Sequence, residues 1–350
     1  MKNKVIVLGP GRKTRGGITS VIKAHEQSEV WEKWNCKWLE TYIDRGSIAK
    51  TYYFLKGYFH FLLNIRSANI VHIHFSEPMS AFRKSIFFKT AKLFRKIVVL
   101  HFHAFSPEST IFGKHKKMYA KMFNGADAII ALSSFWKEQI SNIIVEKSQI
   151  NVIYNPCPSI SELPDYNKQN AILFAGTLNS RKGYSDLLRA FANIAKQFPE
   201  WKVAFAGNGE IEKAKNLTCD LGIENQVVFE GWISGDEKDR LFKSSSIFCL
   251  PSYAEGFPMA VLDAWAYGLP IITTPVGGLP DVLINGENAL VFNPGDIVSL
   301  LVHLESLITN EQLRTKLSEA SFNLSKNEFS IKRISVQLDN LYSGLLNKSH

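Results

Sequence analysis

The sequence predicts an α/β protein made of two doubly wound domains. The chain has 350 residues, more than a single hydrophobic core normally serves. Short β-branched runs alternate with helical patterns along the chain, which is typical of parallel sheets covered by helices on both faces. A segment rich in Pro, Ser and Asn (155–170) reads as a linker between the two halves. We therefore expect a first domain over 1–157, a second over 168–328, and a C-terminal helix within 329–350 that packs back towards the first domain.

Eleven strands are expected. Five lie in the first domain, at residues 4–9, 68–75, 96–103, 127–133 and 150–156. Six lie in the second, at residues 171–177, 201–209, 226–232, 246–252, 269–275 and 288–294. Ligands of open α/β sheets bind beyond the carboxyl ends of the strands, so functional residues are expected just after these segments.

The composition is that of an ordinary folded protein, with 45% hydrophobic and 21% charged residues. The four cysteines form no Cys-x-x-Cys pair, so we expect reduced thiols rather than a zinc site or a disulfide framework. No secretory signal is evident, and no apolar run reaches the roughly 18 residues needed to cross a bilayer. These features favour a cytoplasmic protein.

The charge is distributed unevenly. Residues 1–150 hold 24 Lys and Arg against 10 Asp and Glu, whereas residues 151–350 hold 17 against 22. The first half therefore carries a net charge of +14 and the second of −5. A basic half indicates an anionic partner: phosphates, nucleic acid or a membrane surface.

Two features of the first half follow predicted strands. Gly16 and Gly17 precede a helix expected to begin near Ile18, and they suit either a phosphate site or a flexible turn. The glycine spacing does not match Gly-x-Gly-x-x-Gly, so a dinucleotide fingerprint is not supported. His74, His101 and His103 end strands, and such histidines are more often structural than catalytic. A zinc site would need a third ligand at a suitable spacing, and none is evident, so no metal site is predicted.

The segment "FAGTLNSRKGYSDLLRAF" (174–191) opens the second half. A strand ends at Gly176, the loop carries Arg181 and Lys182, and a helix follows Gly183. Two adjacent cations in a strand-to-helix loop suit a diphosphate, although a solvated basic turn is an equal alternative. Asn208 stands in a second glycine-rich loop, "FAGNGE" (205–210).

The segment "SYAEGFPMAVLDAWAYGLP" (252–270) holds two carboxylates around a predicted helix start. A helix should begin near Pro258, with Glu255 in the loop before it and Asp263 about two turns into it. A helix N-terminus binds anions, and carboxylates accept hydrogen bonds from sugar hydroxyls. This arrangement indicates a ligand with a diphosphate and hydroxyl groups. The simpler interpretation is a surface glutamate and a solvated aspartate, but apolar residues surround Asp263.

The order and spacing of "AGTLNSRKG", "AGNGE", "LPSYAEGFPMAVLDAWAYGLPII" and "TTPVGGLPDVLINGENALVFNPGD" resemble the family four glycosyltransferases, which are retaining enzymes of GT-B fold. The resemblance is strongest over 171–295. It is looser in the first domain, through "GGITSVI", "VHIHF" and "VVLHFHAF". It implies two Rossmann-like domains facing a cleft, the first binding the acceptor and the second the nucleotide sugar.

The resemblance also implies roles for individual residues. Glu255 matches the first carboxylate of the Glu-x7-Glu element, which contacts the donor sugar. Asp263 takes the second position, which holds the ribose, and departs from the family by being one methylene shorter. Lys182 matches the family lysine of the diphosphate loop, and Thr177 stands where the family has Arg, so Arg181 could supply that charge. The other implied donor-binding residues are Gly16, Gly17, Asn208, Trp232 beside the base, Gly256, Phe257, Met259 and Ala260. His103 matches the histidine that faces the donor sugar, and Glu255, Lys182 and His103 are the implied catalytic residues.

The implied reaction moves a sugar from a nucleoside diphosphate, UDP by expectation, to a hydroxyl of a glycan or lipid-linked glycan in cell-surface polysaccharide synthesis. It implies no cofactor and no metal. Two alternatives stay open: a GT-B-like nucleotide-sugar epimerase, and a basic nucleic-acid-binding protein. The absence of a recognised nucleic-acid module argues against the second.

Two helical segments of the first domain combine cations with aromatic residues: "KTYYFLKGYFHFLL" (50–63) and "AFRKSIFFKTAKLFRKIVV" (81–99). Both could lie on an anionic membrane at the inner face of the cell membrane, where a lipid-linked acceptor is found. The alternative is that both bury their aromatic residues in the core and direct their lysines to water.

Overall fold

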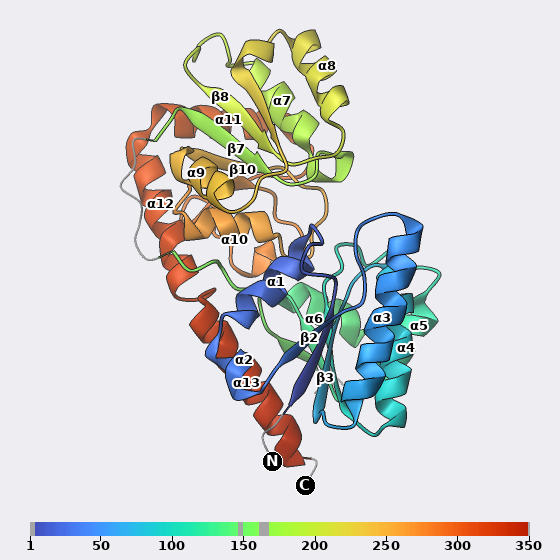
Figure 1. Ribbon diagram of the computed structural model, residues 1–350. Coiled ribbons are helices and arrows are strands. Elements are labelled where there is room, and N and C mark those ends of the chain that lie inside the picture. The colour runs from blue at the N-terminus through green and yellow to red at the C-terminus, as the bar shows by residue number, and fades with distance from the viewer. Residues whose placement is uncertain (1–3, 146–149, 161–167, 349–350) are drawn as a thin grey trace. The chain divides into compact units, whose positions relative to one another are not determined.

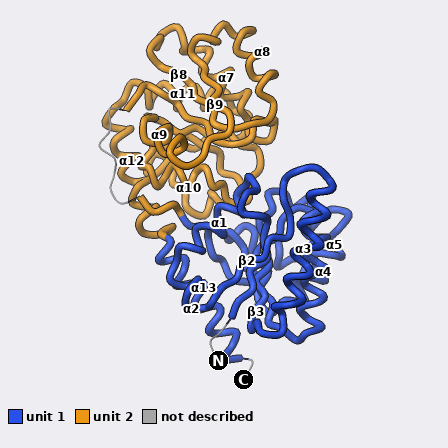
Figure 2. The backbone as a smooth tube through the Cα atoms, viewed as in Figure 1, with its two compact units in different colours: residues 1–156, 331–350 blue, residues 157–330 orange. Residues whose placement is uncertain are grey.

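The computed structural model describes residues 4–145, 150–160 and 168–348. The chain forms two compact units, one of residues 1–156 with 331–350 and one of residues 157–330 (Figure 2). Residues 161–167 of the predicted linker lie outside the described residues. Each unit is built around its own six-stranded sheet, so the predicted doubly wound α/β fold is confirmed.

The first unit contains a wholly parallel sheet in the order β2-β1-β3-β4-β5-β6. Its strands are β1 (Val5–Gly9), β2 (Lys37–Glu40), β3 (Ile70–Phe75), β4 (Ile97–Phe102), β5 (Ala128–Ala131) and β6 (Ile150–Val152). Strand β2 was not among the expected strands. It is a short edge strand without β-branched residues, so it lacks the pattern that marks the other five.

Helices cover both faces of this sheet (Figure 1). One face packs on α3 (Ser47–Ile65), α4 (Pro78–Leu93), α5 (Lys116–Asn124) and α6 (Ser134–Ser141). The other packs on α1 (Gly17–Glu26), α2 (Glu29–Lys33) and the C-terminal helix α13 (Ile331–Lys348). Because side chains alternate along a strand, the two cores draw on alternate residues of the same strands.

Helix α13 follows the second unit in sequence but packs in the first. It contacts α2 and α1 and contributes Ile334, Leu338 and Tyr342 to their shared core. Its Asp339 accepts hydrogen bonds from the Lys33 ammonium at 2.6 Å and the Trp34 indole at 2.7 Å. The chain therefore returns to the first unit at its end.

The second unit also has a parallel sheet, in the order β12-β11-β10-β7-β8-β9. The strands are β7 (Ala171–Ala175), β8 (Lys202–Ala206), β9 (Val227–Gly231), β10 (Ile247–Leu250), β11 (Ile271–Thr273) and β12 (Leu290–Val291). The helices are α7 (Tyr184–Ala192), α8 (Ile211–Leu221), α9 (Asp236–Ser244), α10 (Met259–Ala266), α11 (Ile297–Thr309) and α12 (Glu311–Lys326). Helix α7 packs on α8 and α11, and α10 packs on α12. All six expected strands are present, in shorter form.

Candidate functional site

Glu255 lies in the loop between β10 and α10 and is nearly buried, at 6% exposure. Its carboxylate accepts hydrogen bonds from the Lys182 ammonium at 2.5 Å and the Ser252 hydroxyl at 2.7 Å. The Arg181 guanidinium approaches its other oxygen at 3.3 Å. The structure thus brings together three residues that the sequence assigned to one site. The simpler interpretation of Glu255 as a solvated loop residue is wrong.

The loop that carries the two cations is a short 3-10 turn, η2 (Ser180–Lys182), after β7. The Asn179 side chain caps it by accepting a hydrogen bond from the Lys182 backbone N–H at 3.1 Å. The Arg181 guanidinium donates to the Ala254 carbonyl at 2.6 Å, and the Arg181 carbonyl accepts from the Tyr253 N–H at 2.7 Å. These bonds join the cation loop to the Glu255 loop, so the basic turn is not merely solvated.

Gly183 ends this turn and begins α7, and its φ is 68°. A Cβ atom there would lie 2.0 Å from the Pro251 carbonyl oxygen, closer than any real contact. Only glycine combines the left-handed conformation with this close approach. Gly183 therefore allows the two loops to meet.

Helix α10 begins directly beyond Glu255, with Pro258 as its N-cap. Gly256, Phe257, Met259 and Ala260 line its start, as expected from the sequence. The first backbone N–H groups of a helix lack partners within the helix, and the helix dipole favours negative charge there. The start of α10 thus follows the loop in which Arg181 and Lys182 contact Glu255.

Asp263 lies within α10, and its side chain is 14% exposed. Burial raises the pKa of this carboxyl, and the Lys238 ammonium, 2.6 Å from its Oδ1 atom, acts in the opposite direction. Lys238 comes from α9, and sequence reasoning did not single it out. Asp263 is therefore not a solvated helix residue, and its charge has a partner within the second unit.

Asn208 and Trp232 follow β8 and β9. The Asn208 carbonyl accepts a hydrogen bond from the Leu178 N–H at 2.7 Å, so its loop lies beside the loop after β7. Trp232 follows the last residue of β9 and is 41% exposed. Both residues thus lie beyond the carboxyl ends of strands, where α/β proteins bind ligands.

Gly16, Gly17 and His103 belong to the first unit. Gly16 is the N-cap of α1, and Gly17 is its first residue, one position before the expected start. His103 follows β4, and its Nε2 atom lies 2.9 Å from Nδ1 of His74. Burial, aided by the charge on His25, lowers the pKa of His103 to about 3, so its imidazole is neutral near pH 7.

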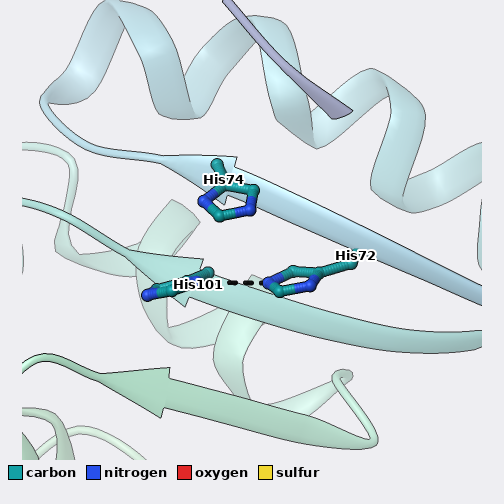
Figure 3. Close-up of side chains that lie close together, drawn as sticks. All are labelled: His72, His74 and His101. Atoms are coloured by element: carbon teal, nitrogen blue, oxygen red, sulfur yellow. Dashed lines mark hydrogen bonds between the residues drawn. The ribbon is translucent and has the colours of Figure 1, made fainter. Parts of the chain in front are cut away.

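The sequence showed no third ligand at a suitable spacing for a zinc site, but the structure brings His72 close to His74 and His101. His72 lies two residues before His74 on β3, and His101 is the neighbour of His74 on the adjacent strand β4 (Figure 3). Ring nitrogens of these three buried side chains lie within 4.8 Å of one another, so they could hold a metal ion. Spacing along one strand did not reveal the cluster, because its members meet across neighbouring strands.

The ring arrangement favours a hydrogen-bond chain over a metal centre. His72 Nδ1 lies 2.6 Å from the Tyr342 hydroxyl, and His72 Nε2 lies 3.2 Å from His101 Nδ1. The planes of His72 and His74 are within 17° of parallel, and those of His72 and His101 within 15°. Near-parallel rings direct their lone pairs alongside one another rather than to one point. We interpret the cluster as neutral histidines that link β3, β4 and α13.

Two residues that were not predicted for the site, Ser252 and Gly277, also contact or closely approach Glu255. Ser252 donates to its carboxylate, and a Cβ atom at Gly277 would lie 2.2 Å from the Glu255 carbonyl oxygen. Sequence reasoning missed both. The serine lies three residues before Glu255 in a loop, and the glycine belongs to a segment whose approach to Glu255 depends on the fold.

The chain matches two family descriptions. Residues 159–324 match "Glycosyl transferases group 1", and residues 39–158 match "Glycosyltransferase Family 4". Together these matches extend over most of both units.

Similar proteins were found by sequence and by structure. The chain is 33% identical over 221 residues to a lipopolysaccharide 1,6-galactosyltransferase of Salmonella typhimurium, with 60% of each chain covered. It is 31% identical over 215 residues to an uncharacterized glycosyltransferase of Haemophilus influenzae, with 59% of each covered. The aligned part thus spans about three fifths of each of these relatives.

The fold is shared with HepE of Anabaena, solved in complex with UDP. The TM-score is 0.78 at 16% identity, covering 97% of this chain and all of that one. With the two parallel sheets, this similarity shows the GT-B fold. The family matches, the curated relatives and the fold agree with one another, and the chain belongs to the family four glycosyltransferases, glycosyl transferases group 1.

Proposed function

We propose that this protein transfers a sugar from a UDP-linked donor to a hydroxyl of a glycan or lipid-linked glycan, with retention at the anomeric carbon. One observation carries the proposal: Lys182 and Arg181 converge on the nearly buried Glu255 at the N-terminus of α10. Cations and helix N–H groups suit a diphosphate, and the adjacent carboxylate suits sugar hydroxyls.

The chemistry follows from where charge develops. The bond between the anomeric carbon and the diphosphate oxygen breaks, and the leaving diphosphate gains negative charge. Arg181, Lys182 and the N–H groups of Phe257, Met259 and Ala260 stabilise that charge. The acceptor oxygen bonds to the anomeric carbon on the same face, and its proton passes to the leaving phosphate. This scheme uses neither a metal nor a cofactor.

The remaining donor contacts follow the same logic. Asp263 accepts hydrogen bonds from the ribose through the oxygen that Lys238 does not hold, and Gly256, Asn208 and Trp232 border the nucleotide. In the first unit, Gly16 and Gly17 approach the donor phosphate and His103 contacts the transferred sugar. The first unit binds the acceptor. A neutral imidazole at His103 suits hydrogen bonding to sugar hydroxyls.

The donor and the biological setting rest on similar proteins. HepE, which shares the fold, has been solved with UDP and with UDP-glucose. The Salmonella relative is named for lipopolysaccharide galactosyl transfer. These similarities support a UDP-sugar donor and a role in cell-surface polysaccharide synthesis. We place the protein in the cytoplasm, peripherally at the inner face of the cell membrane. No helix in the described part of the chain combines the length and apolar character needed to cross a bilayer.

Two alternatives differ in their products or ligands. A GT-B-like epimerase would convert the nucleotide sugar without an acceptor. A nucleic-acid-binding protein would bind DNA or RNA with strong salt dependence and would be indifferent to nucleotide sugars. The ion-pair arrangement around Glu255 gathers diphosphate-binding groups in the acidic half of the chain, which favours a nucleotide-sugar enzyme over a nucleic-acid-binding protein. Transfer to an acceptor distinguishes the transferase from the epimerase.

The test is transfer of labelled sugar from UDP-sugars to a panel of glycan acceptors, with the anomeric configuration of the product read by NMR. Glu255→Gln should lower the transfer rate about a hundredfold or more, because a charged contact to the transition state is lost. The matched control is Glu212→Gln, an exposed carboxylate on α8 paired with Lys215. Inversion in the product would contradict retention. Equal rates in both variants would remove Glu255 from the site.

A further inference from the structure

Helix α3 carries a row of large apolar side chains on its outer surface. We define the α3 stripe as the six such residues whose exposure ranges from 41% to 89%. They are Ile48, Tyr52, Leu55, Phe59, Leu62 and Leu63. At about 100° per residue, all six lie within an arc of about 100° on the helix. They therefore form one continuous strip along almost the full length of α3.

The stripe is distinct from the side of α3 that packs in the core. Gly57, Phe61 and Ile65 are buried, and Phe61 contacts the Phe87 ring of α4 in an edge-to-face arrangement. Phe54 and Tyr58 also pack against Phe87. Packing within the unit thus accounts for the inner side of the helix and leaves the stripe facing outward.

The two segments that the sequence suggested as membrane-binding differ in how much of their apolar surface is exposed. Helix α4 buries Phe87 and Phe88, so for these residues the core interpretation is confirmed. Its Lys92 pairs with Asp127 at 2.9 Å, and Lys96 beyond it donates to the Arg66 carbonyl. Helix α4 adds only Met79, Phe82 and Leu93 to the exposed apolar surface. Of the two helices, α3 therefore exposes more large apolar side chains.

The charged residues of α3 itself have one sign, because the helix contains Lys50 and Lys56 and no acidic residue. Between positions 45 and 107 the chain has ten Lys and Arg, of which Lys92 is paired with Asp127, and a single acidic residue, Glu77. The Glu77 carboxylate accepts hydrogen bonds from the Phe105 N–H and the Ser109 hydroxyl. Lys56 lies on α3 beside the stripe, with its ammonium 5.8 Å from the Tyr52 ring centroid. The surface thus combines exposed apolar side chains with positive charge.

We propose that the α3 stripe is a docking surface for an anionic lipid bilayer. A helix with one apolar outer face and flanking cations lies in the plane of the interface, with its apolar side chains in the acyl boundary and its cations at the headgroups. A second copy of the same surface would satisfy the apolar side chains but would oppose positive charge with positive charge. An anionic bilayer satisfies both features.

The test is co-sedimentation with vesicles of equal parts phosphatidylglycerol and phosphatidylcholine, compared with pure phosphatidylcholine. The wild type should bind the anionic vesicles more tightly, and added salt should weaken that binding. The double variant Leu55→Ser with Phe59→Ser should bind at least about tenfold more weakly, because two apolar side chains no longer enter the bilayer. Lys56→Glu should weaken binding about fivefold or more, on the anionic vesicles only.

The matched control is Val298→Ser with Val302→Ser, which removes two exposed apolar side chains from α11 in the second unit. It should bind vesicles as the wild type does. Circular dichroism melting checks that each variant is folded.

Absence of vesicle binding in the wild type, or equal binding by the stripe variant and the wild type, would overturn the proposal. A loss of self-association on sedimentation velocity with vesicle binding unchanged would assign the stripe to a second copy instead. Vesicle binding requires no donor or acceptor, so this result is independent of the transfer assay.

Discussion

At the scale of single residues, the central feature is one nearly buried carboxylate held by two cations from a different loop. Removing Glu255 from water costs free energy that its contacts with Lys182, Arg181 and Ser252 offset. The contacts also fix the orientations of the Glu255, Lys182 and Arg181 side chains in the absence of a ligand. Preorganised groups need little reorganisation during reaction, which is how charged sites accelerate it.

The pair of Asp263 and Lys238 allows a second test at this scale. We expect Asp263→Asn, Lys238→Met and the combined variant to show a coupling free energy of about 1–3 kcal/mol in stability, because the charges are in contact and largely buried. Urea unfolding of the four proteins measures it. In Lys238→Met the pKa of Asp263 should rise further, because its opposing charge is gone.

The same four proteins report on nucleotide binding. Asp263→Asn should weaken UDP binding, because the amide is a poorer acceptor for ribose hydroxyls. Lys243→Met is the matched control for Lys238→Met, since Lys243 also lies on α9 and pairs with Asp239 at 3.6 Å. Purely additive stability effects would show that the contact between Asp263 and Lys238 contributes nothing.

At the scale of elements, the turn before α7 makes a sharp prediction. Gly183→Ala should destabilise the protein more than Gly222→Ala does. Both glycines have a left-handed φ, 68° and 66°, but a Cβ atom at position 222 meets nothing within 4 Å. The control therefore measures the conformational cost alone, about 1 kcal/mol. The added cost at Gly183 comes from the Pro251 carbonyl, and thermal melting of both variants measures the difference.

The elements also show what local sequence could predict. All eleven expected strands exist, and most of them have apolar runs that are buried on both faces. The edge strand β9 instead alternates between more buried and exposed residues. Strand β2 was missed, because an edge strand such as "KWLE" needs no such run. The two amphipathic segments looked alike in sequence. Which of their aromatic side chains are buried depends on how α3 and α4 pack against each other, and that packing became visible only in the fold.

At the scale of the whole molecule, the buried histidines predict how stability depends on pH. Burial lowers the pKa of His25 to about 4 and that of His103 to about 3, and it lowers the pKa values of His72, His74 and His101 well below 6.5. The unfolded chain binds more protons than the folded one below about pH 6.5. The first unit should therefore keep its full stability above that pH and lose it as the pH falls. The slope is up to about 1.4 kcal/mol per pH unit for each histidine.

Hydrogen exchange, corrected for its intrinsic pH dependence, measures this effect unit by unit. Between about pH 7.5 and about pH 5.5, protection should fall in the first unit and change less in the second, which contains His303 alone. His60→Gln, an exposed control on α3, should leave the dependence unchanged. Equal protection of the first unit at both pH values would contradict the account.

The resemblance predicted members of the candidate site but not the contacts between them. Resemblance to the family placed Lys182 and Glu255 in one site although they are 73 positions apart. It could not show that they pair directly, because that contact depends on where the loops after β7 and β10 meet. Lys238 gave no signal at all, since a lysine on a highly charged helix resembles a solvated residue. Lys238 meets Asp263 only because α9 and α10 lie close together in the folded second unit.

The measurement that tests the central claim most directly is calorimetric titration of UDP, with GDP for comparison, into the wild type, Lys182→Ala and Lys215→Ala. Lys215 is an exposed lysine on α8 and serves as the charge-matched control. We expect UDP to bind the wild type and Lys215→Ala alike, and Lys182→Ala at least about tenfold more weakly, because a charge-assisted contact to the diphosphate is lost. Equal affinity for UDP in Lys182→Ala and the wild type would show that the diphosphate does not bind at Lys182 and would contradict the proposed site.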